Sequence, residues 1–283
     1  MQCDLHVHST YSDGTKTPSE LVEVALELGL KAIALTDHNT IDGLEEFMEY
    51  ASNKNIDAIP GVEISTEYNG IELHIIGLFI SRFHFNSVRE YLAGISKRKE
   101  ESNIKLIAEL AKFGYEIDYQ KLRAEHAGSI NRAVIAAEMM RKGYINSIKE
   151  AFDTILSEKN GVYVPPKRID SLDAIEFLDY INAVPVLAHP LISMSKEELE
   201  EFLPQAKLRG LIGMETIYSE YSEEETLLAK ELVNKYGLCE SGGSDYHGDN
   251  KPEIQLGTGL GSLHIPFDII NNLKRGGVIK REK

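Results

Sequence analysis

DLHVHSTYSDG, residues 4–14, opens with alternating polar and apolar side chains, a pattern that predicts a β-strand followed by a short turn. Residues two apart on a strand point to the same side, so His6 and His8 form a pair that can hold one metal ion. Asp4 shares this face, and we expect it to orient an imidazole ring rather than to bind the ion. Asp13 lies in a Ser-Asp-Gly turn, and beside the histidine pair a metal ligand is a better interpretation of it than a plain turn residue. The stretch therefore predicts a strand that leads into a metal site.

Histidines and carboxylates recur at or near the ends of five later strand-like runs. These runs are TDH at 36–38, GVEIS at 61–65, LHIIG at 73–77, LAHP at 187–190 and GGSDYHG at 242–248. Imidazole and carboxylate groups are ligands for Zn, Mn and Fe. We therefore expect one polynuclear metal site built from the whole chain, to which these runs add the candidate ligands His38, Glu63, His74, His189, Asp245 and His247.

Other interpretations exist beside some of these assignments. Asp37 and His38 are adjacent and point in different directions, so we expect His38 to bind and Asp37 to support it. His74 lies inside an apolar run, where a core histidine is by itself an equally good interpretation. Glu215 also ends a strand-like run, and we expect it to orient a ligand rather than to bind an ion or to act as a base.

The order of predicted elements indicates an α/β protein. Residues 1–85 and 165–283 alternate strand and helix signals, whereas residues 86–164 are helical in pattern. Repeated strand–helix units imply parallel strands, and the candidate ligands lie at or near strand ends, where barrel enzymes place their chemistry. We therefore predict a seven-stranded (β/α) barrel with an inserted helical cap subdomain over its mouth. Capping boxes predict helix starts after Thr17, Ser195 and Ser222.

Composition excludes several classes of function. The 283 residues carry a net charge of −15, which disfavours a non-specific nucleic-acid binder but leaves a small phosphorylated substrate open. The two cysteines, Cys3 and Cys239, form neither a zinc-type pair nor a disulfide framework. The sequence shows neither a signal peptide nor an apolar run long enough to span a membrane, so we expect a cytoplasmic protein without membrane or stable nucleic-acid partners. It does not indicate an oligomeric state.

The predicted helical insertion offers cations for a substrate. Arg132 follows Ser129 at an expected helix N-terminus, where backbone N–H groups and a guanidinium could hold a phosphate. Lys167 and Arg168 could add positive charge, although solvated loop cations are about as good an interpretation. We therefore predict Arg132, Ser129 and Lys167 as substrate-binding residues.

Taken together, the quoted segments resemble the polymerase and histidinol phosphatase (PHP) family, whose motifs they follow in order from residue 4 to residue 248. The resemblance implies a distorted (β/α)7 barrel with a site for up to three divalent ions, Mn, Zn or Fe. It also implies which residues hold each ion: His6, His8, Glu63 and Asp245 the first, Glu63, His74 and His189 the second, and Asp13, His38 and His247 the third.

Within this family the chain looks most like stand-alone phosphoesterases that remove the 3'-phosphate of nucleoside 3',5'-bisphosphates or trim short RNA from its 5' end. Ala133-Val134 stands where Pro-His is frequent, and Tyr221 where a histidine is common. The hypothesis is hydrolysis of a pAp-like nucleotide by a metal-bridging hydroxide, with Glu63, Asp245 and Arg132 as catalytic residues. Alternatives are a 5'-3' exonuclease on short RNA, a histidinol-phosphate phosphatase and a non-catalytic metal-binding module.

Overall fold

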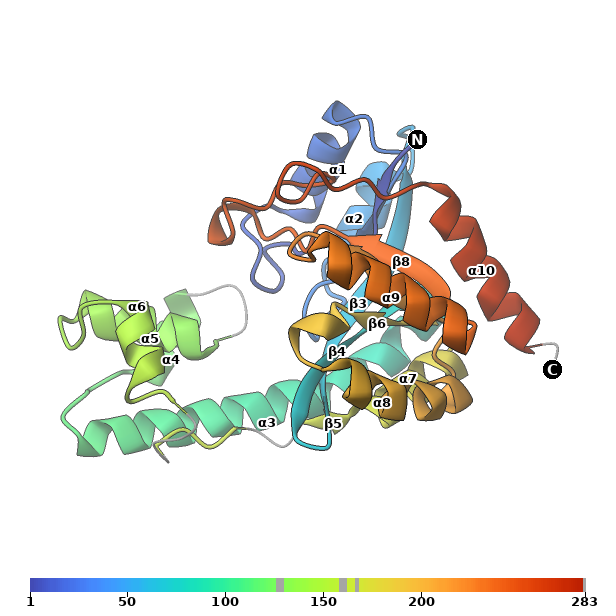
Figure 1. Cartoon of the computed structure of the whole chain (residues 1–283). Coiled ribbons are helices and arrows are strands. Elements are labelled where there is room, and N and C mark those ends of the chain that lie inside the picture. Colours follow the sequence, from blue (N-terminus) through green and yellow to red (C-terminus); the bar gives the residue numbers. More distant parts are fainter. Residues whose placement is uncertain (126–129, 158–161, 166–167, 282–283) are drawn as a thin grey trace. The chain divides into compact units, whose positions relative to one another are not determined.

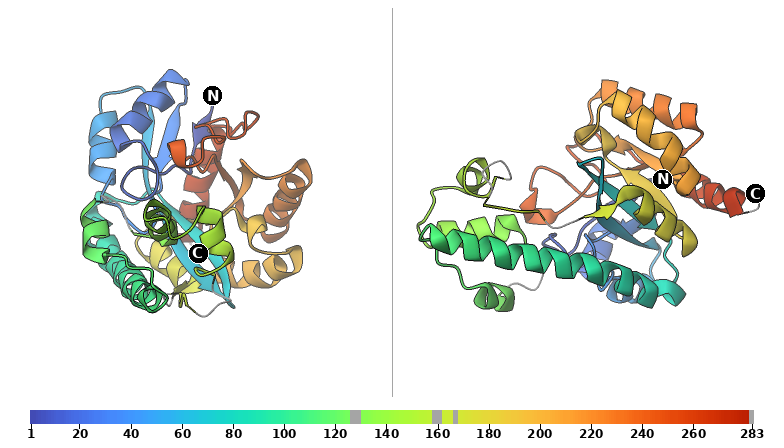
Figure 2. Two further views of the ribbon diagram at one scale, coloured as in Figure 1. Left: turned by 90° about the vertical axis from the view of Figure 1, so that its left-hand side faces the viewer. Right: turned by 90° about the horizontal axis from the view of Figure 1, so that it is seen from below.

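The structure is a computed structural model that describes residues 1–125, 130–157, 162–165 and 168–281. By its internal contacts the chain forms two compact units. The first consists of Met1–Arg89 and Arg168–Lys283, and the second of Glu90–Lys167. Figures 1 and 2 show strands surrounded by helices in the first unit and helices in the second.

One curved sheet runs through the first unit. The backbone N–H of Leu5 donates to the carbonyl of Gly242 at 3.3 Å, and that of Asp245 donates to the carbonyl of His6 at 2.9 Å. These bonds join the first strand to the last, so the sheet is a nearly closed barrel, and the predicted fold class is confirmed. Its strands follow the order β1 (Cys3–Asp4), β2 (Ala32–Leu35), β3 (Asp57–Tyr68), β4 (Ile71–Leu78), β6 (Val184–Ala188), β7 (Gly213–Tyr218) and β8 (Cys239–Gly243), with β5 (Ile169–Asp170) paired to β3 outside this path.

Strand β4 departs from the predicted parallel arrangement, because it runs antiparallel to both β3 and β6. Asn69 and Gly70 alone connect it to β3, with φ angles of 51° and 83°. Positive φ at both central residues is the signature of a tight hairpin, which leaves no room for a crossover helix. His74 therefore lies in the first half of its strand rather than near its end, yet it pairs with Ala188 at the C-terminal end of β6.

Strands β1 and β3 also differ in length from their prediction. Regular pairing in β1 covers two residues and is followed by an isolated bridge at Val7, so His6 and His8 flank that bridge. Strand β3 is longer than predicted, with 12 residues, and Glu63 lies at its middle instead of its end. The side-chain directions needed for the site are kept in both cases.

Helices cover the outside of the barrel, and the capping boxes at Thr17, Ser195 and Ser222 form as predicted. Each of these side chains accepts a hydrogen bond from the third residue of its helix, which satisfies an N–H group that the helix cannot pair. The helices are α1 (Pro18–Glu27), α2 (Leu44–Ala51), α7 (Ser171–Tyr180), α8 (Lys196–Arg209), α9 (Glu223–Tyr236) and α10 (Asp268–Arg281).

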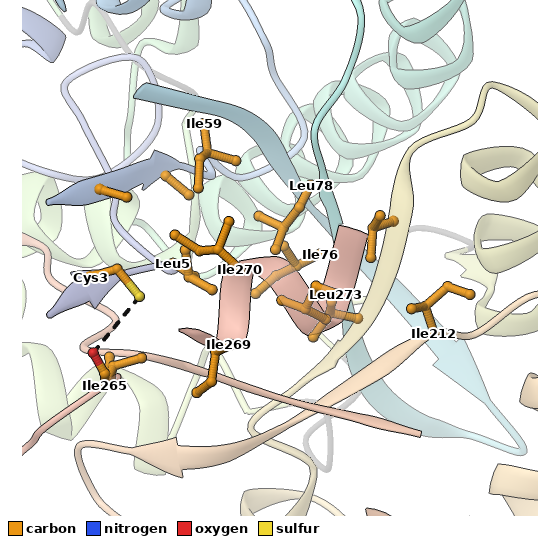
Figure 3. Packing of buried hydrophobic residues seen from close by; sticks show 14 of the residues in the cluster. Cys3, Leu5, Ile59, Ile76, Leu78, Ile212, Ile265, Ile269, Ile270 and Leu273 are labelled. Atoms are coloured by element: carbon orange, nitrogen blue, oxygen red, sulfur yellow. Dashed lines mark hydrogen bonds between the residues drawn. The ribbon is translucent and has the colours of Figure 1, made fainter. Parts of the chain in front are cut away.

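An apolar cluster fills the barrel at the N-terminal ends of its parallel strands. Ile269, Ile270 and Leu273 of α10 pack there against Leu5 and Ile76 (Figure 3). All five side chains are less than 10% exposed, so they add to the hydrophobic stabilisation of the fold. Helix α10 thus closes one end of the barrel and leaves the other end for polar side chains.

The second unit has a core of its own. The helix α3 (Phe85–Lys112) enters it from the first unit, and α4 (Tyr119–Glu125), α5 (Arg132–Arg141) and α6 (Ile148–Asp153) follow. Their buried side chains include Leu110, which belongs to one apolar cluster within this unit. No strand occurs among its described residues, and its role as a cap over the barrel stays a prediction. In the part of the chain that the structure describes, every helix is too short or too polar to span a lipid bilayer.

Candidate metal centre

The first unit brings all nine predicted metal ligands together. They fall into four overlapping groups, in each of which one donor atom per residue lies within 4.8 Å of the others. Imidazole and carboxylate groups gathered in this way are donors that suit divalent metal ions. The groups are His6, Glu63 and His189; His6, His8 and Asp245; His38, Glu63 and His74; and His8, Asp13, His38 and His247.

Glu63 lies between histidines on both sides of its carboxylate and is fully buried. Its Oε1 atom is 2.8 Å from Nδ1 of His74 and 3.2 Å from Nε2 of His189. Because the two oxygens face different histidines, Glu63 has the geometry of a ligand that bridges two ions. The ring nitrogens around Oε2 lie at 2.9–3.3 Å and belong to His6, His8 and His38.

The group formed by His8, Asp13, His38 and His247 lies nearer the solvent. Oδ1 of Asp13 is 3.3 Å from Nε2 of His247, and its Oδ2 is 3.9 Å from Nε2 of His38. The Asp13 side chain is 36% exposed, whereas those of Glu63 and His6 are fully buried. An ion held in this group would therefore exchange with solution more readily than one beside Glu63.

Backbone strain marks two of the candidate ligands. Asp245 has a φ of 59° and His189 a φ of 28°, a region that residues other than glycine rarely adopt. Positions held in such conformations are concentrated at functional sites, where the surrounding structure compensates their cost. At Asp245, the hydrogen bond from its backbone N–H to the carbonyl of His6 supplies part of this support.

Glu215 orients two of the candidate ligands, as the sequence analysis expected. Its Oε1 atom hydrogen-bonds Nδ1 of His6 at 3.0 Å, and its Oε2 accepts the backbone N–H of His189 at 2.7 Å. The first bond turns Nε2 of His6 toward Glu63 and Asp245. A carboxylate behind a ligating histidine fixes the ring and its tautomer.

Replacing Glu215 with glutamine should therefore weaken metal binding and turnover by about 10- to 100-fold, the usual effect of losing such a partner. Glutamine keeps the size but not the charge of Glu215, so the fold should persist. Metal titration of the variant by competition with a chelating indicator measures the effect. Glu240→Gln, on the neighbouring strand β8 with 39% of its side chain exposed, is the matched control and should behave like the wild type.

Asp4 and Asp37 accept hydrogen bonds from backbone N–H groups and serine hydroxyls rather than from imidazole rings. Asp4 accepts hydrogen bonds from the N–H and hydroxyl of Ser244, at 2.9 and 2.6 Å, and from the N–H of Gly257 at 2.8 Å. The expectation that Asp4 orients an imidazole is wrong, because barrel closure places the chain of Ser244 against it. Asp37 binds Ser9 through two hydrogen bonds, at 2.7 and 2.6 Å, and so holds the loop that carries Asp13.

Burial and neighbouring opposite charges shift the pKa values of His6 and Glu63 in opposite directions. Burial lowers the pKa of His6, but the surrounding carboxylates, Glu63 first, outweigh it and raise that pKa well above its usual value. Burial raises the pKa of Glu63, but the histidines around it, His38 first, lower it well below the usual value. His8 differs, because burial and neighbouring histidines together lower its pKa to about 3. His8 is thus neutral at physiological pH, the form that binds a metal ion.

Several donor atoms of the centre lack a hydrogen bond. Among the described residues, six buried atoms of these side chains have no hydrogen-bond partner. Unsatisfied buried polar atoms are rare and costly, and here they face one another. Divalent ions fit this arrangement, since each would coordinate several such atoms at once. The atoms are Nε2 of His6, both ring nitrogens of His8, Oδ1 of Asp13, Nδ1 of His38 and Oε2 of Glu63.

Of the predicted substrate residues, Arg132 belongs to the second unit, and Ser129 and Lys167 are not among the described residues. Arg132 belongs to the second unit, where its guanidinium lies 4.2 Å from the ring centroid of Tyr163 and 5.5 Å from that of Phe152. Its helix begins as predicted, with Asn131 as the N-cap. The role of Arg132 toward a phosphate stays a prediction. Ser129 and Lys167 lie outside the described residues, and Arg168 pairs with Glu72 at 2.7 Å.

Sequence reasoning missed two residues that contact the centre, Tyr218 and Lys251. Both bind Oδ2 of Asp245, the hydroxyl at 3.0 Å and the ammonium at 2.7 Å. Lys251 follows Asp245 by six residues in a polar loop, which is a local signal that could have been used. Tyr218 ends β7 three residues after Glu215 and carries no signal in the sequence beyond that position.

Comparison with known proteins agrees with the geometry of the centre. The family model of the PHP domain matches residues 4–164. The chain is 32% identical over 262 residues to the 5'-3' exoribonuclease Rnm of Salmonella typhimurium, which covers 91% of this chain and 88% of the relative. It is 27% identical over 251 residues to the 3',5'-nucleoside bisphosphate phosphatase of Chromobacterium violaceum, covering 86% of both proteins.

A solved structure from Bifidobacterium adolescentis, named a metal-dependent phosphoesterase, shares the fold. Its TM-score is 0.81 at 24% identity, and the match covers 99% of this chain and 98% of the other. The agreement in fold therefore extends over both units of the chain as well as over the segments that carry the centre.

Proposed function

The chain belongs to the PHP domain family and is a metal-dependent phosphoesterase, and we propose that it hydrolyses the 3'-phosphate of nucleoside 3',5'-bisphosphates such as pAp. The observation that carries the proposal is the position of Glu63, whose two oxygens face five imidazole nitrogens inside the barrel. We further propose that the nine clustered side chains hold up to three ions of Mn, Zn or Fe.

The residues of the chain provide the frame for this chemistry. Bound divalent ions would supply a hydroxide nucleophile near neutral pH and neutralise charge on the phosphoryl group. Glu63 and Asp245 would hold the ions at fixed separation, and Glu215 keeps the ring of His6 in place. Arg132 would neutralise phosphoryl oxygens as charge moves to the leaving group.

The choice of substrate is supported by charge and by one of the relatives. A net charge of −15 repels long polyphosphate chains but not a small nucleotide whose phosphates meet local cations. The bisphosphate phosphatase of Chromobacterium violaceum is related over most of its length. The reaction would transfer the 3'-phosphoryl group to water and leave a nucleoside 5'-phosphate.

The higher identity to 5'-3' exoribonucleases favours a second candidate, removal of nucleotides from the 5' end of short RNA. Both reactions can break the same bond, between phosphorus and the 3'-oxygen of a 5'-phosphorylated nucleoside. They differ only in whether that phosphorus carries a further nucleoside. A site that accepts the first substrate could therefore serve the second if the space beyond the phosphorus is open.

A substrate panel tests the proposal. The protein loaded with Mn, Zn or Fe is assayed on pAp, on a short 5'-phosphorylated RNA and on histidinol phosphate, with phosphate and nucleotide release as readouts. We expect the highest kcat/KM on pAp. A higher kcat/KM on RNA would establish the exonuclease instead, and metal binding without hydrolysis of any substrate would establish a non-catalytic module.

Arg132→Lys should lower kcat/KM on pAp by about 10- to 100-fold, because lysine keeps the charge but loses the bidentate fork that suits a phosphate. Metal content should stay unchanged, since a guanidinium is a cation and does not ligate a metal ion. Arg141→Lys is the matched control: it lies in the same helix and is paired with Glu138 at 2.6 Å. Equal kcat/KM in both variants would remove Arg132 from the substrate site.

A further inference from the structure

The two oxygens of Asp245 have different surroundings. Oδ1 faces ring nitrogens, with Nε2 of His8 at 3.1 Å and Nε2 of His6 at 3.4 Å. Oδ2 faces hydrogen-bond donors instead, the Tyr218 hydroxyl at 3.0 Å and the Lys251 ammonium at 2.7 Å. One oxygen therefore belongs to the candidate metal centre and the other to a pair of protein donors.

Lys251 has an unusual position for a cation. Among the described residues, it is the single lysine or arginine that forms an ion pair with any of the nine candidate ligands. Its side chain is 35% exposed, whereas that of Asp245 is 6% exposed, so the ammonium covers the solvent side of a buried carboxylate. A cation beside a site for divalent cations weakens metal binding by charge repulsion. The position of Lys251 therefore indicates a second role that offsets this repulsion.

The loop that carries Lys251 is anchored to the loop of Asp13. The N–H of Asp249 donates to the Thr15 hydroxyl at 2.9 Å, and the side-chain amide of Asn250 donates to the carbonyl of Asp13 at 2.7 Å. These bonds hold the backbone just before Lys251 in place. Tyr218 is equally restrained, because it is buried and its ring centroid lies 5.2 Å from that of His189.

We propose that Lys251 and Tyr218 are positioning residues that make Asp245 a ligand through Oδ1 alone. Two donors at Oδ2 satisfy that oxygen and set the rotation of the carboxylate, so that a single oxygen points at the ring nitrogens. The inference rests on the proposed metal centre but not on the choice of substrate. It assigns a function to two residues that would otherwise be a surface cation and a core tyrosine.

A positioning role and a purely electrostatic role of Lys251 predict opposite changes in metal affinity for Lys251→Met. Loss of a donor that orients a ligand weakens metal binding, typically by 10- to 100-fold. Loss of a positive charge alone would strengthen the binding of a divalent cation. Tyr218→Phe removes the other donor without changing any charge, so it tests positioning free of this opposing effect.

The experiment measures Mn²⁺ affinity and stoichiometry of the metal-free full chain by competition with a chelating indicator. We expect about 10- to 100-fold weaker binding in Lys251→Met and in Tyr218→Phe, with substantial recovery in Lys251→Arg. Lys54→Met is the matched control, because Lys54 pairs with Glu23 at the same 2.7 Å distance and, in the described part of the chain, forms no ion pair with any of the nine candidate ligands. Circular dichroism confirms that each variant is folded.

Unchanged or tighter Mn²⁺ binding in folded Tyr218→Phe and Lys251→Met would overturn the inference while leaving the proposed function intact. If Lys251→Met does not fold, the result of Tyr218→Phe decides alone. Absence of binding of Mn²⁺, Zn²⁺ and Fe²⁺ by the wild-type protein would overturn the metal centre and this inference together. Metal binding as expected, without hydrolysis of any panel substrate, would support the inference and remove the proposed activity.

Discussion

Replacing Glu63 with glutamine is expected to lower kcat/KM by roughly 100- to 1000-fold, which corresponds to about 3–4 kcal/mol of transition-state stabilisation. The physical reason is that Glu63 is the carboxylate that both halves of the centre share. A glutamine amide group would turn hydrogen-bond donors toward ring nitrogens that need a negative charge between them. The variant should also bind fewer ions per chain, which mass spectrometry of the purified protein measures.

The fold should survive this change, because glutamine has nearly the same volume and β3 pairs through its backbone. The matched control is Glu67→Gln, on the same strand, where 45% of the side chain is exposed and the nearest cation, Arg168, is 3.9 Å away. We expect wild-type kinetics and metal content there. Full activity of folded Glu63→Gln with an unchanged ion count would show that the centre is not organised around Glu63.

Removal of divalent ions by a chelator should reduce turnover to background and lower the melting temperature. Ions that bind only the folded state stabilise it by about 2.7 kcal/mol at a free concentration of 100 times Kd. In their absence, six buried donor atoms in the described chain lack a hydrogen-bond partner, and the histidines and carboxylates balance one another instead. Activity and melting temperature should return when Mn²⁺, Zn²⁺ or Fe²⁺ is added back.

The affinity of the metal-free protein for metal ions is expected to rise with pH. Burial lowers the pKa of His74, but Glu63 outweighs burial and raises it to about 10, so the metal-free protein holds a proton there at neutral pH. An ion must displace that proton, so affinity should rise as the pH is raised toward this pKa. Calorimetry in buffers of different ionisation enthalpy measures the released protons. A chelator that leaves both turnover and melting temperature unchanged would contradict the metal-dependent mechanism.

Short sequence patterns predicted those features that depend on interactions between neighbouring residues. The alternation around His6 and His8 predicted that both rings share one face, and the structure places both against Glu63. The capping box at Thr17 predicted a helix start for the same reason, since its hydrogen bonds join neighbouring residues. The residue types at the strand ends then indicated which ends meet in one site, because a buried carboxylate such as Glu63 needs partners of opposite charge.

Features that depend on strand direction or on barrel closure were not predicted. The Asn69–Gly70 turn was overlooked, although it dictates that Ser65 pairs with His74 and so places His74 diagonally across from Glu63. The contact of Asp4 with Gly257 joins residues 253 positions apart and has no local signal. The pairing of Lys251 with Asp245 likewise follows from the path of a loop that only the folded barrel determines.

The seam between the first and last strands has a consequence for biogenesis. Leu5 and His6 are bonded to Gly242 and Asp245, so His6 meets the carboxylate of Asp245 only once the chain has been synthesised beyond that residue. A nascent chain that traps an ion early would hold it with an incomplete set of donors. The full set of candidate donors therefore requires synthesis through Asp245, and a fragment that stops before Asp245 should retain ions poorly however well its earlier elements fold.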